Sequence, residues 1–159
     1  MTTDHKENLF ILVKSLSKSE KRQFKLYAGR VEANQNAKFL HLFNILDRAK
    51  TYDEREILKK NFVTKQQLSN LKAHLYRQIL VSLRMNPSIQ NARMQIREQL
   101  DFATVLYQKG LYKQSLKILE KAKSIAYGFE EKYLAFEIVE LEKVIESQYI
   151  TRSMSNRAE

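Results

Sequence analysis

The chain of 159 residues has no cysteine and no tryptophan, and only one proline and three glycines. Without cysteine it can form neither a disulfide nor a thiolate metal site, and it lacks a cysteine nucleophile. Glycine and proline punctuate most turns, so their scarcity favours long helices with short connections over a many-stranded sheet. Hydrophobic residues make up 43% of the chain, which is enough to bury a core. We therefore predict an all-α protein.

Long apolar runs are also missing. No segment approaches the roughly 18 consecutive apolar residues that a membrane-spanning helix needs. The first eight residues are polar and include Asp4 and Glu7, unlike the basic start and apolar core of a secretory signal. These features predict a soluble, cytoplasmic protein with no membrane partner.

Groups for catalysis are sparse. His5, His41 and His74 are scattered along the chain, with no glutamate-flanked histidine pair and no carboxylate cluster spaced for a divalent ion. The three glycines stand far apart, so they do not form a phosphate-binding loop. No pattern supplies a nucleophile, a base and an orienting group together. The sequence therefore predicts no enzyme, no catalytic residue, no metal site and no cofactor.

Helix-start signals divide the chain into about eight helical segments. Three pairs have the spacing of a capping box, in which two side chains satisfy the free amides of a new helix: Ser17 with Glu20, Asp53 with Glu56, and Thr64 with Gln67. The predicted helices cover about residues 6–16, 17–28, 37–50, 53–62, 65–85, 89–109, 111–127 and 130–150, with a polar loop at 29–36.

Asn86, Pro87 and Ser88 form the clearest break, because proline disfavours helix at the residue before it and Ser88 can cap the next helix. This break predicts a basic helical region at 1–86 and a second helical region at 87–150, followed by a frayed polar tail at 151–159.

Residues 102–126 have the spacing of a helical hairpin with a tight turn. Ala103 and Ser115 are small where the two helices would cross, and Gly110 lies where the first helix must end. A glycine just past a helix end accepts the left-handed conformation that closes the helix. The facing positions predicted for the two helices are Phe102, Ala103, Leu106 and Tyr107, and Tyr112, Ser115, Leu119 and Ala122.

This pattern resembles the tetratricopeptide repeat, a helix-turn-helix unit of about 34 residues that stacks into superhelical scaffolds. The resemblance covers one repeat, about Gln99 to Tyr127, and includes Gly110 and all of the facing positions except Tyr107. Gln99 stands where the family often has tryptophan, and no proline follows Ala126. An ordinary two-helix hairpin with a small-residue crossing is the alternative.

The resemblance implies antiparallel helical hairpins in a right-handed superhelix, whose first helices line a groove for a peptide or a partner helix. The implied groove positions are Arg97, Leu100, Thr104, Tyr107 and Gln108. Members that clamp a terminal carboxylate have lysine and asparagine where this chain has Leu100 and Thr104, so no such clamp is predicted. The five positions are also compatible with packing against the preceding long helix, in which case no groove is open.

The last predicted helix looks like the start of a further repeat. Leu134, Ile138, Leu141 and Ile145 form one apolar face, although Glu137 stands where the family has a small residue. A single hairpin of this kind cannot bury its faces alone. Three alternatives follow: packing against the first half, membership of a longer helical array, or association such as a homodimer.

Positive charge is concentrated in the first half. Residues 1–90 hold 17 Lys and Arg against 8 Asp and Glu, whereas residues 91–159 hold 11 against 10. Basic regions attract nucleic acid or acidic protein surfaces. A helix-turn-helix at 53–85 would offer a nucleic-acid surface, with the candidate contacts Lys65, Lys72, Arg77 and Arg84.

The spacing of these four residues argues against a single basic stripe, because about 100° per residue spreads them over different helix faces. Long basic side chains that cover a core helix are the alternative. Five tyrosines fall mostly at core spacing, and we expect them to pack in the core: Tyr76, Tyr107, Tyr112, Tyr127 and Tyr133.

The sequence therefore predicts a non-enzymatic protein-protein interaction module of tetratricopeptide-repeat type, with a protein or peptide partner. The alternative function is a nucleic-acid-associated transcriptional regulator that binds through its basic first half.

Overall fold

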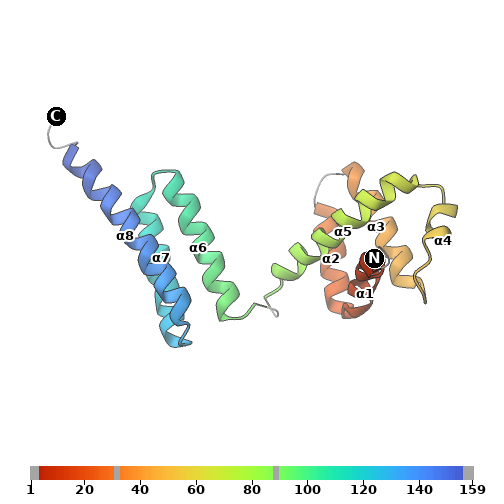
Figure 1. Ribbon diagram of the computed structural model, residues 1–159, viewed down its shortest axis with the longest axis horizontal. Coiled ribbons are helices and arrows are strands. Elements are labelled where there is room, and N and C mark those ends of the chain that lie inside the picture. Colours follow the sequence, from red (N-terminus) through yellow and green to blue (C-terminus); the bar gives the residue numbers. More distant parts are fainter. Residues whose placement is uncertain (1–3, 31–32, 88–89, 156–159) are drawn as a thin grey trace. The chain divides into compact units, whose positions relative to one another are not determined.

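The computed structural model describes residues 4–30, 33–87 and 90–155, and it describes side chains in 8–29, 38–87 and 90–150. The described residues form eight helices and no strand, as the composition predicted. The chain divides into two compact units, Met1–Ile89 and Gln90–Glu159, and Figure 1 labels the helices of each unit.

The first unit contains α1 (Asp4–Ser15), α2 (Lys18–Arg30), α3 (Ala33–Arg48), α4 (Glu54–Lys59) and α5 (Lys65–Arg84). α5 packs against α1, α2 and α3, and α3 also packs against α1 and α2. Phe24 and Phe43 are fully buried in this core, with 4.7 Å between their ring centroids. The other buried apolar residues include Leu9, Val13, Leu42, Leu46, Ile57, Leu68, Leu75 and Ile79.

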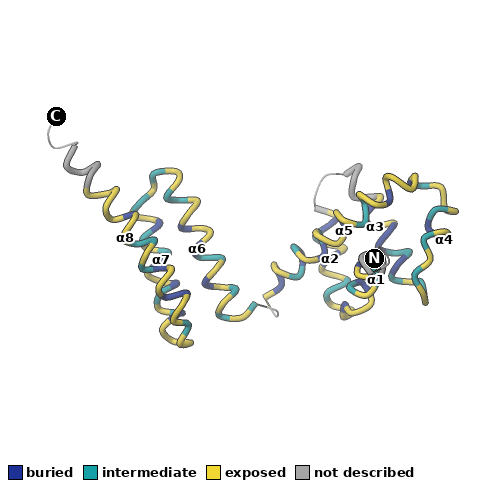
Figure 2. Tube along the Cα trace, viewed as in Figure 1, coloured by how far each residue is buried: buried dark blue, intermediate teal, exposed yellow. Residues whose placement is uncertain are grey.

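The second unit contains α6 (Ala92–Gln108), α7 (Tyr112–Gly128) and α8 (Lys132–Ser155). α7 packs against both α6 and α8, and α6 also contacts α8. Buried positions recur at intervals along these helices rather than in continuous runs, as expected for amphipathic helices (Figure 2). The predicted apolar face of α8 is confirmed, since Leu134, Ile138 and Ile145 are buried and Leu141 is half-buried.

Two helix-closing turns of the same type connect α6 to α7 and α7 to α8. In the first, Gly110 has a φ of 75°, and the Leu111 amide donates to the Leu106 carbonyl at 2.9 Å. In the second, Glu130 has a φ of 54°, and the Glu131 amide donates to the Ala126 carbonyl at 2.8 Å. This six-to-one hydrogen bond is the Schellman closure, which prefers glycine at the left-handed position. The predicted role of Gly110 is thus confirmed.

We expect Glu130→Gly to stabilise the second unit. Glu130 adopts a left-handed backbone conformation, which costs a residue with a Cβ about 1–2 kcal/mol relative to glycine. Part of that gain is offset by the greater freedom of glycine in the unfolded chain, so we expect about 0.5–1 kcal/mol. Urea unfolding followed by circular dichroism measures the change. The control is Glu137→Gly, an exposed position within α8, which should destabilise by about 1 kcal/mol.

The predicted capping signals have mixed outcomes. Two capping boxes are confirmed: Ser17 with Glu20, and Thr64 with Gln67, each with both reciprocal hydrogen bonds. The third is wrong in part, because Asp53 caps α4 through the Arg55 amide while Glu56 forms an ion pair with Lys59 instead.

Several predicted helix limits are wrong. The polar loop predicted at 29–36 is largely helical, since α2 continues to Arg30 and α3 begins at Ala33; residues 31–32 lie outside the described residues. No proline interrupts this stretch, so polar composition alone does not end a helix. The helix predicted from residue 89 begins at Ala92, where the Asn91 side chain accepts the Met94 amide as the cap. Ser88 itself lies outside the described residues.

The predicted tail is also shorter than expected, because α8 continues through Ser155 and includes the first five of its residues. Residues 156–159 lie outside the described residues.

Candidate interaction surfaces

The crossing of α6 and α7 is built on the two small residues that the sequence singled out. The Ser115 hydroxyl donates to the Ala103 carbonyl at 2.7 Å, and both residues are fully buried. Leu119 and Ala122 of α7 are buried as predicted. Phe102 is a correction, since its side chain is 48% exposed. Phe102 and Ala103 are neighbours about 100° apart on the helix, so Ala103 faces α7 and Phe102 turns outward.

The implied groove positions on α6 divide into two groups. Arg97, Thr104 and Gln108 are exposed, whereas Tyr107 is half-buried, with its ring centroid 5.7 Å from that of Tyr112. Leu100 is a correction: it is only 6% exposed and belongs to the core of the second unit. Leu100 lies about 60° from Ala103 on the helix, on the side that α6 buries. The surface available to a partner therefore excludes Leu100.

Lys72, a candidate nucleic-acid contact, is instead part of a polar cluster between α4 and α5. Its ammonium donates to the Glu54 carboxylate and to the Tyr52 hydroxyl, each at 3.0 Å. The Tyr52 hydroxyl in turn donates to Glu54 at 3.1 Å. Burial acts to lower the pKa of Lys72, but these hydrogen bonds and charges outweigh it and leave the pKa raised. This cluster ties α4 to α5 and occupies the charge of Lys72.

We expect Glu54→Gln to weaken the first unit in a pH-dependent way. The side chains of Lys72 and Glu54 are only 14% and 21% exposed, so losing the charge should cost about 1 kcal/mol. The pKa of Lys72 is raised in the folded state. The contribution of the ion pair to the free energy of unfolding is therefore fully present below the unfolded pKa of 10.5, and it is lost as pH rises through the folded pKa.

The measurement is urea unfolding of both chains at about pH 7 and at rising pH above 10.5, where the difference between them should shrink as Lys72 loses its proton at its raised folded pKa. Glu56→Gln is the control on the same helix, because its pair with Lys59 is exposed at both ends. A larger loss for Glu56→Gln than for Glu54→Gln would contradict the assignment.

The four basic candidates on α5 do not gather at one place. Lys65 and Arg77 are exposed at positions twelve residues apart, Arg84 lies at the last turn of α5, and Lys72 is held by Glu54. The short helix α4 and the long helix α5 do follow each other across a turn, as the sequence suggested. The side chains that α5 exposes nevertheless offer no continuous basic row.

The tyrosines also differ in part from expectation. Tyr107 and Tyr112 pack against each other as predicted, but Tyr76, Tyr127 and Tyr133 are 39%, 63% and 89% exposed. Periodicity placed them at core spacing because it cannot tell which side of a helix receives a neighbour.

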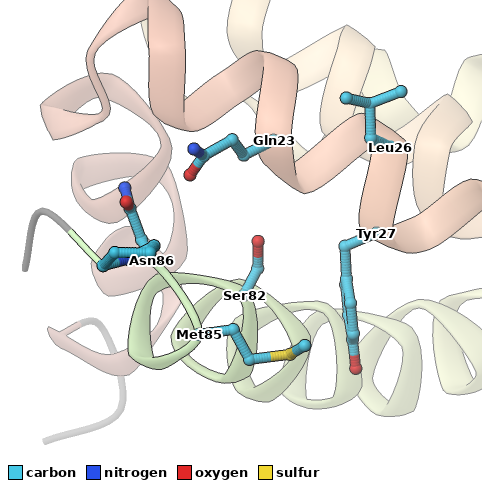
Figure 3. A pocket seen from close by; sticks show the side chains of 7 residues that line it. Gln23, Leu26, Tyr27, Ser82, Met85 and Asn86 are labelled. Carbon is cyan, nitrogen blue, oxygen red and sulfur yellow. The ribbon is translucent and has the colours of Figure 1, made fainter. Parts of the chain in front are cut away.

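A cavity that sequence reasoning missed lies between α2 and the C-terminal end of α5 in the first unit. Its volume is about 400 Å³, and its lining is mostly apolar. Figure 3 shows the Ser82 hydroxyl pointing into the space between the two helices and Tyr27 reaching from α2 toward α5. The lining residues are Gln23, Leu26, Tyr27, Ser82, Met85, Asn86 and Pro87. We call it the α2–α5 cavity.

One wall of the α2–α5 cavity is fixed by a hydrogen bond, because the Tyr27 hydroxyl donates to Gln78 on α5 at 2.7 Å. Ser82 and Asn86 are 7% and 6% exposed, whereas Leu26 and Met85 are 56% and 62% exposed. The cavity therefore has a buried polar base and an exposed apolar rim, an arrangement typical of binding sites.

No group of three or more histidine and carboxylate side chains within the described ranges is placed to hold a metal ion. Across the same ranges, none of the helices combines the length and the apolar character needed to cross a membrane. No protein-family model matches the chain, and no match was found to a curated protein or to a solved structure.

Proposed function

We propose that residues 90–155 form a tetratricopeptide-repeat-like module that binds a peptide or a helix of another protein without catalysing a reaction. The observation that carries this proposal is the crossing of α6 and α7 at Ala103 and Ser115. Two fully buried small residues let the helix backbones approach closely, and a Schellman turn at Gly110 returns the chain at once. In this reading α6 and α7 are an antiparallel hairpin, and α8 is the first helix of the next unit in a right-handed superhelix.

The proposed partner surface is the exposed side of α6. Arg97, Thr104 and Gln108 fall within about 40° of one another around the helix and are all exposed. Arg97 offers a charged fork of donors, and Gln108 offers both a donor and an acceptor. The Thr104 hydroxyl donates to the Leu100 carbonyl at 2.8 Å, so its oxygen remains able to accept from a partner. Half-buried Tyr107 adds an aromatic edge beside this polar row.

The test is selection of binders from a displayed library of random peptides with the full-length chain as bait. We expect selected peptides to lose at least about tenfold in affinity for a chain carrying Arg97→Ala, Thr104→Ala and Gln108→Ala, because the three removed contacts, at about 0.5–1.5 kcal/mol each, together contribute about 1.5 kcal/mol or more. Fluorescence anisotropy with labelled peptides gives the dissociation constants.

The matched control carries Gln114→Ala, Lys117→Ala and Lys121→Ala, three exposed positions on α7. Affinities unchanged by the control but reduced by the α6 variant would support the proposed surface. Equal effects of both variants, or failure of the library to yield any binder, would overturn it.

A further inference from the structure

The α2–α5 cavity adjoins a second, basic hollow on the other side of Leu26. This hollow has a volume of about 430 Å³ and is lined by Lys18, Lys21, Arg22, Lys25, Leu26 and Asp47. Leu26 lines both spaces. A molecule that fills the cavity and passes over Leu26 therefore meets a cluster of cationic side chains directly.

Three of these cations are available to a partner. Lys21 is paired with Asp47 at 2.7 Å, but Lys18, Arg22 and Lys25 are exposed and have no ion-pair partner among the described residues. The Lys25 ammonium lies over the ring of Phe43, 5.7 Å from its centroid. We call Lys18, Arg22 and Lys25 the α2 basic row.

The α2 basic row and the cavity form one continuous amphipathic surface. At about 100° per residue, the row spans about 60° around α2, and Leu26 follows Arg22 by about 40°. Gln23 and Tyr27 come next around the helix and lead into the cavity. Around α2 the surface thus changes from the cationic row to the apolar Leu26. Beyond Leu26 it leads into the cavity, whose buried polar base is formed by Ser82 and Asn86.

We propose that this surface docks an acidic amphipathic peptide segment of a partner protein. Carboxylates of the segment pair with the α2 basic row, and a large apolar side chain enters the α2–α5 cavity between Leu26 and Met85. The proposal concerns the first unit and goes beyond the peptide surface proposed for α6.

Two features favour an acidic peptide over nucleic acid. Nucleic-acid backbones need cations that track successive phosphates, and they gain little from an apolar cavity with an exposed leucine and methionine at its rim. Arginine and methionine are enriched at protein interfaces, where an apolar centre is surrounded by a polar rim. Residues 1–90 contain 17 basic and 8 acidic residues, and this positive balance also suits a negatively charged partner.

The experiment uses the full-length chain and displayed random peptides of about 16 residues, four to five helical turns. The library is selected on the wild-type chain, with removal of every peptide that also binds a chain carrying Lys18→Glu and Lys25→Glu, which leaves Arg22 and Leu26 as independent tests. We expect the remaining peptides to carry Asp or Glu three or four residues apart, beside a large apolar residue. Each is synthesised and its affinity is measured by fluorescence anisotropy.

Two variants and a control then locate the site. Arg22→Glu should weaken binding of the selected peptides about tenfold, and Leu26→Ser about fivefold, by loss of a charge pair and of apolar burial respectively. Both positions are exposed, so circular dichroism should report an unchanged fold. Arg55→Glu makes the same charge reversal at an exposed position of α4 and should leave affinity unchanged.

Four results would overturn the proposal. The first is the absence of acidic, apolar-bearing peptides after selection, and the second is equal weakening by Arg55→Glu. The third is tighter, Arg22-dependent binding of a duplex DNA or RNA oligonucleotide than of any selected peptide, which assigns the surface to nucleic acid. The fourth is concentration-dependent dimerisation in light scattering that Arg22→Glu abolishes, which assigns the surface to a second copy of the chain.

Discussion

Replacing Ala103 with leucine is expected to destabilise the second unit by about 2–3 kcal/mol. Ala103 is fully buried, and its carbonyl receives the Ser115 hydroxyl at 2.7 Å. A leucine side chain at this crossing would have to separate α6 from α7, and densely packed interiors yield little to added volume. A unit of this size has only a few kcal/mol of total stability, so the loss should leave a substantial unfolded fraction. The loss in the free energy of unfolding is measured by urea unfolding, with hydrogen exchange across residues 92–150 as the probe.

Two comparisons separate crowding from other causes. Ala73→Leu is the same substitution at an exposed position of α5 and should change stability by less than about 0.5 kcal/mol. Ser115→Ala keeps the crossing small but removes the hydrogen bond, and should cost about 1 kcal/mol. If Ala103→Leu were tolerated as well as Ala73→Leu, the helices would not meet at Ala103, and the support for the repeat-like crossing would be lost.

This crossing was predictable because its determinants are local. Ala103, Gly110 and Ser115 lie within thirteen consecutive residues, and a glycine closure between two helices leaves few ways for them to meet. The same reasoning was wrong for Phe102 and Leu100, since it assigned faces from a family pattern. α8 and α7 in this chain bury a side of α6 that includes Leu100 and leaves Phe102 outside. Tertiary packing decides whether such residues are buried or exposed, and the sequence pattern of a single helix carries no information on that packing.

The α2–α5 cavity was not predictable for the opposite reason. Its lining joins Gln23, Leu26 and Tyr27 to Ser82 and Met85, which are more than fifty residues away in sequence. Helical periodicity identifies which side of α2 is apolar, but it carries no information on which helix covers that side. The one hint in the sequence was that Leu26 interrupts a basic stretch, and a lone exposed leucine is common on protein surfaces.

The partners of Lys72 could not be predicted from the pattern of charges along α5. The sequence offered two readings of Lys72, a nucleic-acid contact or a long basic side chain that covers a core helix. Its ammonium instead donates to Glu54 and Tyr52, with its side chain 14% exposed. Glu54 and Tyr52 lie near the start of α4, and nothing in the spacing of the α5 residues identifies them as partners. The exposed cations Lys18, Arg22 and Lys25 lie together on α2, and no motif in the sequence marked them as a site.

Phe43→Ala is expected to destabilise the first unit by about 3–5 kcal/mol, the largest effect of any substitution considered. Phe43 is fully buried, with its ring centroid 4.7 Å from that of Phe24 on α2. Truncation removes the apolar burial of the ring and the aromatic pair, and it leaves a cavity where α2 and α3 meet, because a close-packed core relaxes only in part. Hydrogen exchange across residues 8–29 and 38–85 measures the loss of stability directly.

The control for Phe43→Ala is Tyr76→Ala, which removes an aromatic ring that is 39% exposed on α5 and should cost less than about 1 kcal/mol.

Because Phe24 and Phe43 are in contact, Phe24→Ala combined with Phe43→Ala should cost less than the sum of the two single losses. Additive losses in this double-mutant cycle would mean that the two rings do not share one packing site. A loss for Phe43→Ala no greater than for Tyr76→Ala would contradict the core itself. The α2 basic row and Leu26 on the rim of the α2–α5 cavity both lie on α2, so a first unit loosened at Phe43 should also bind the selected acidic peptides more weakly, without any change at Arg22 or Leu26.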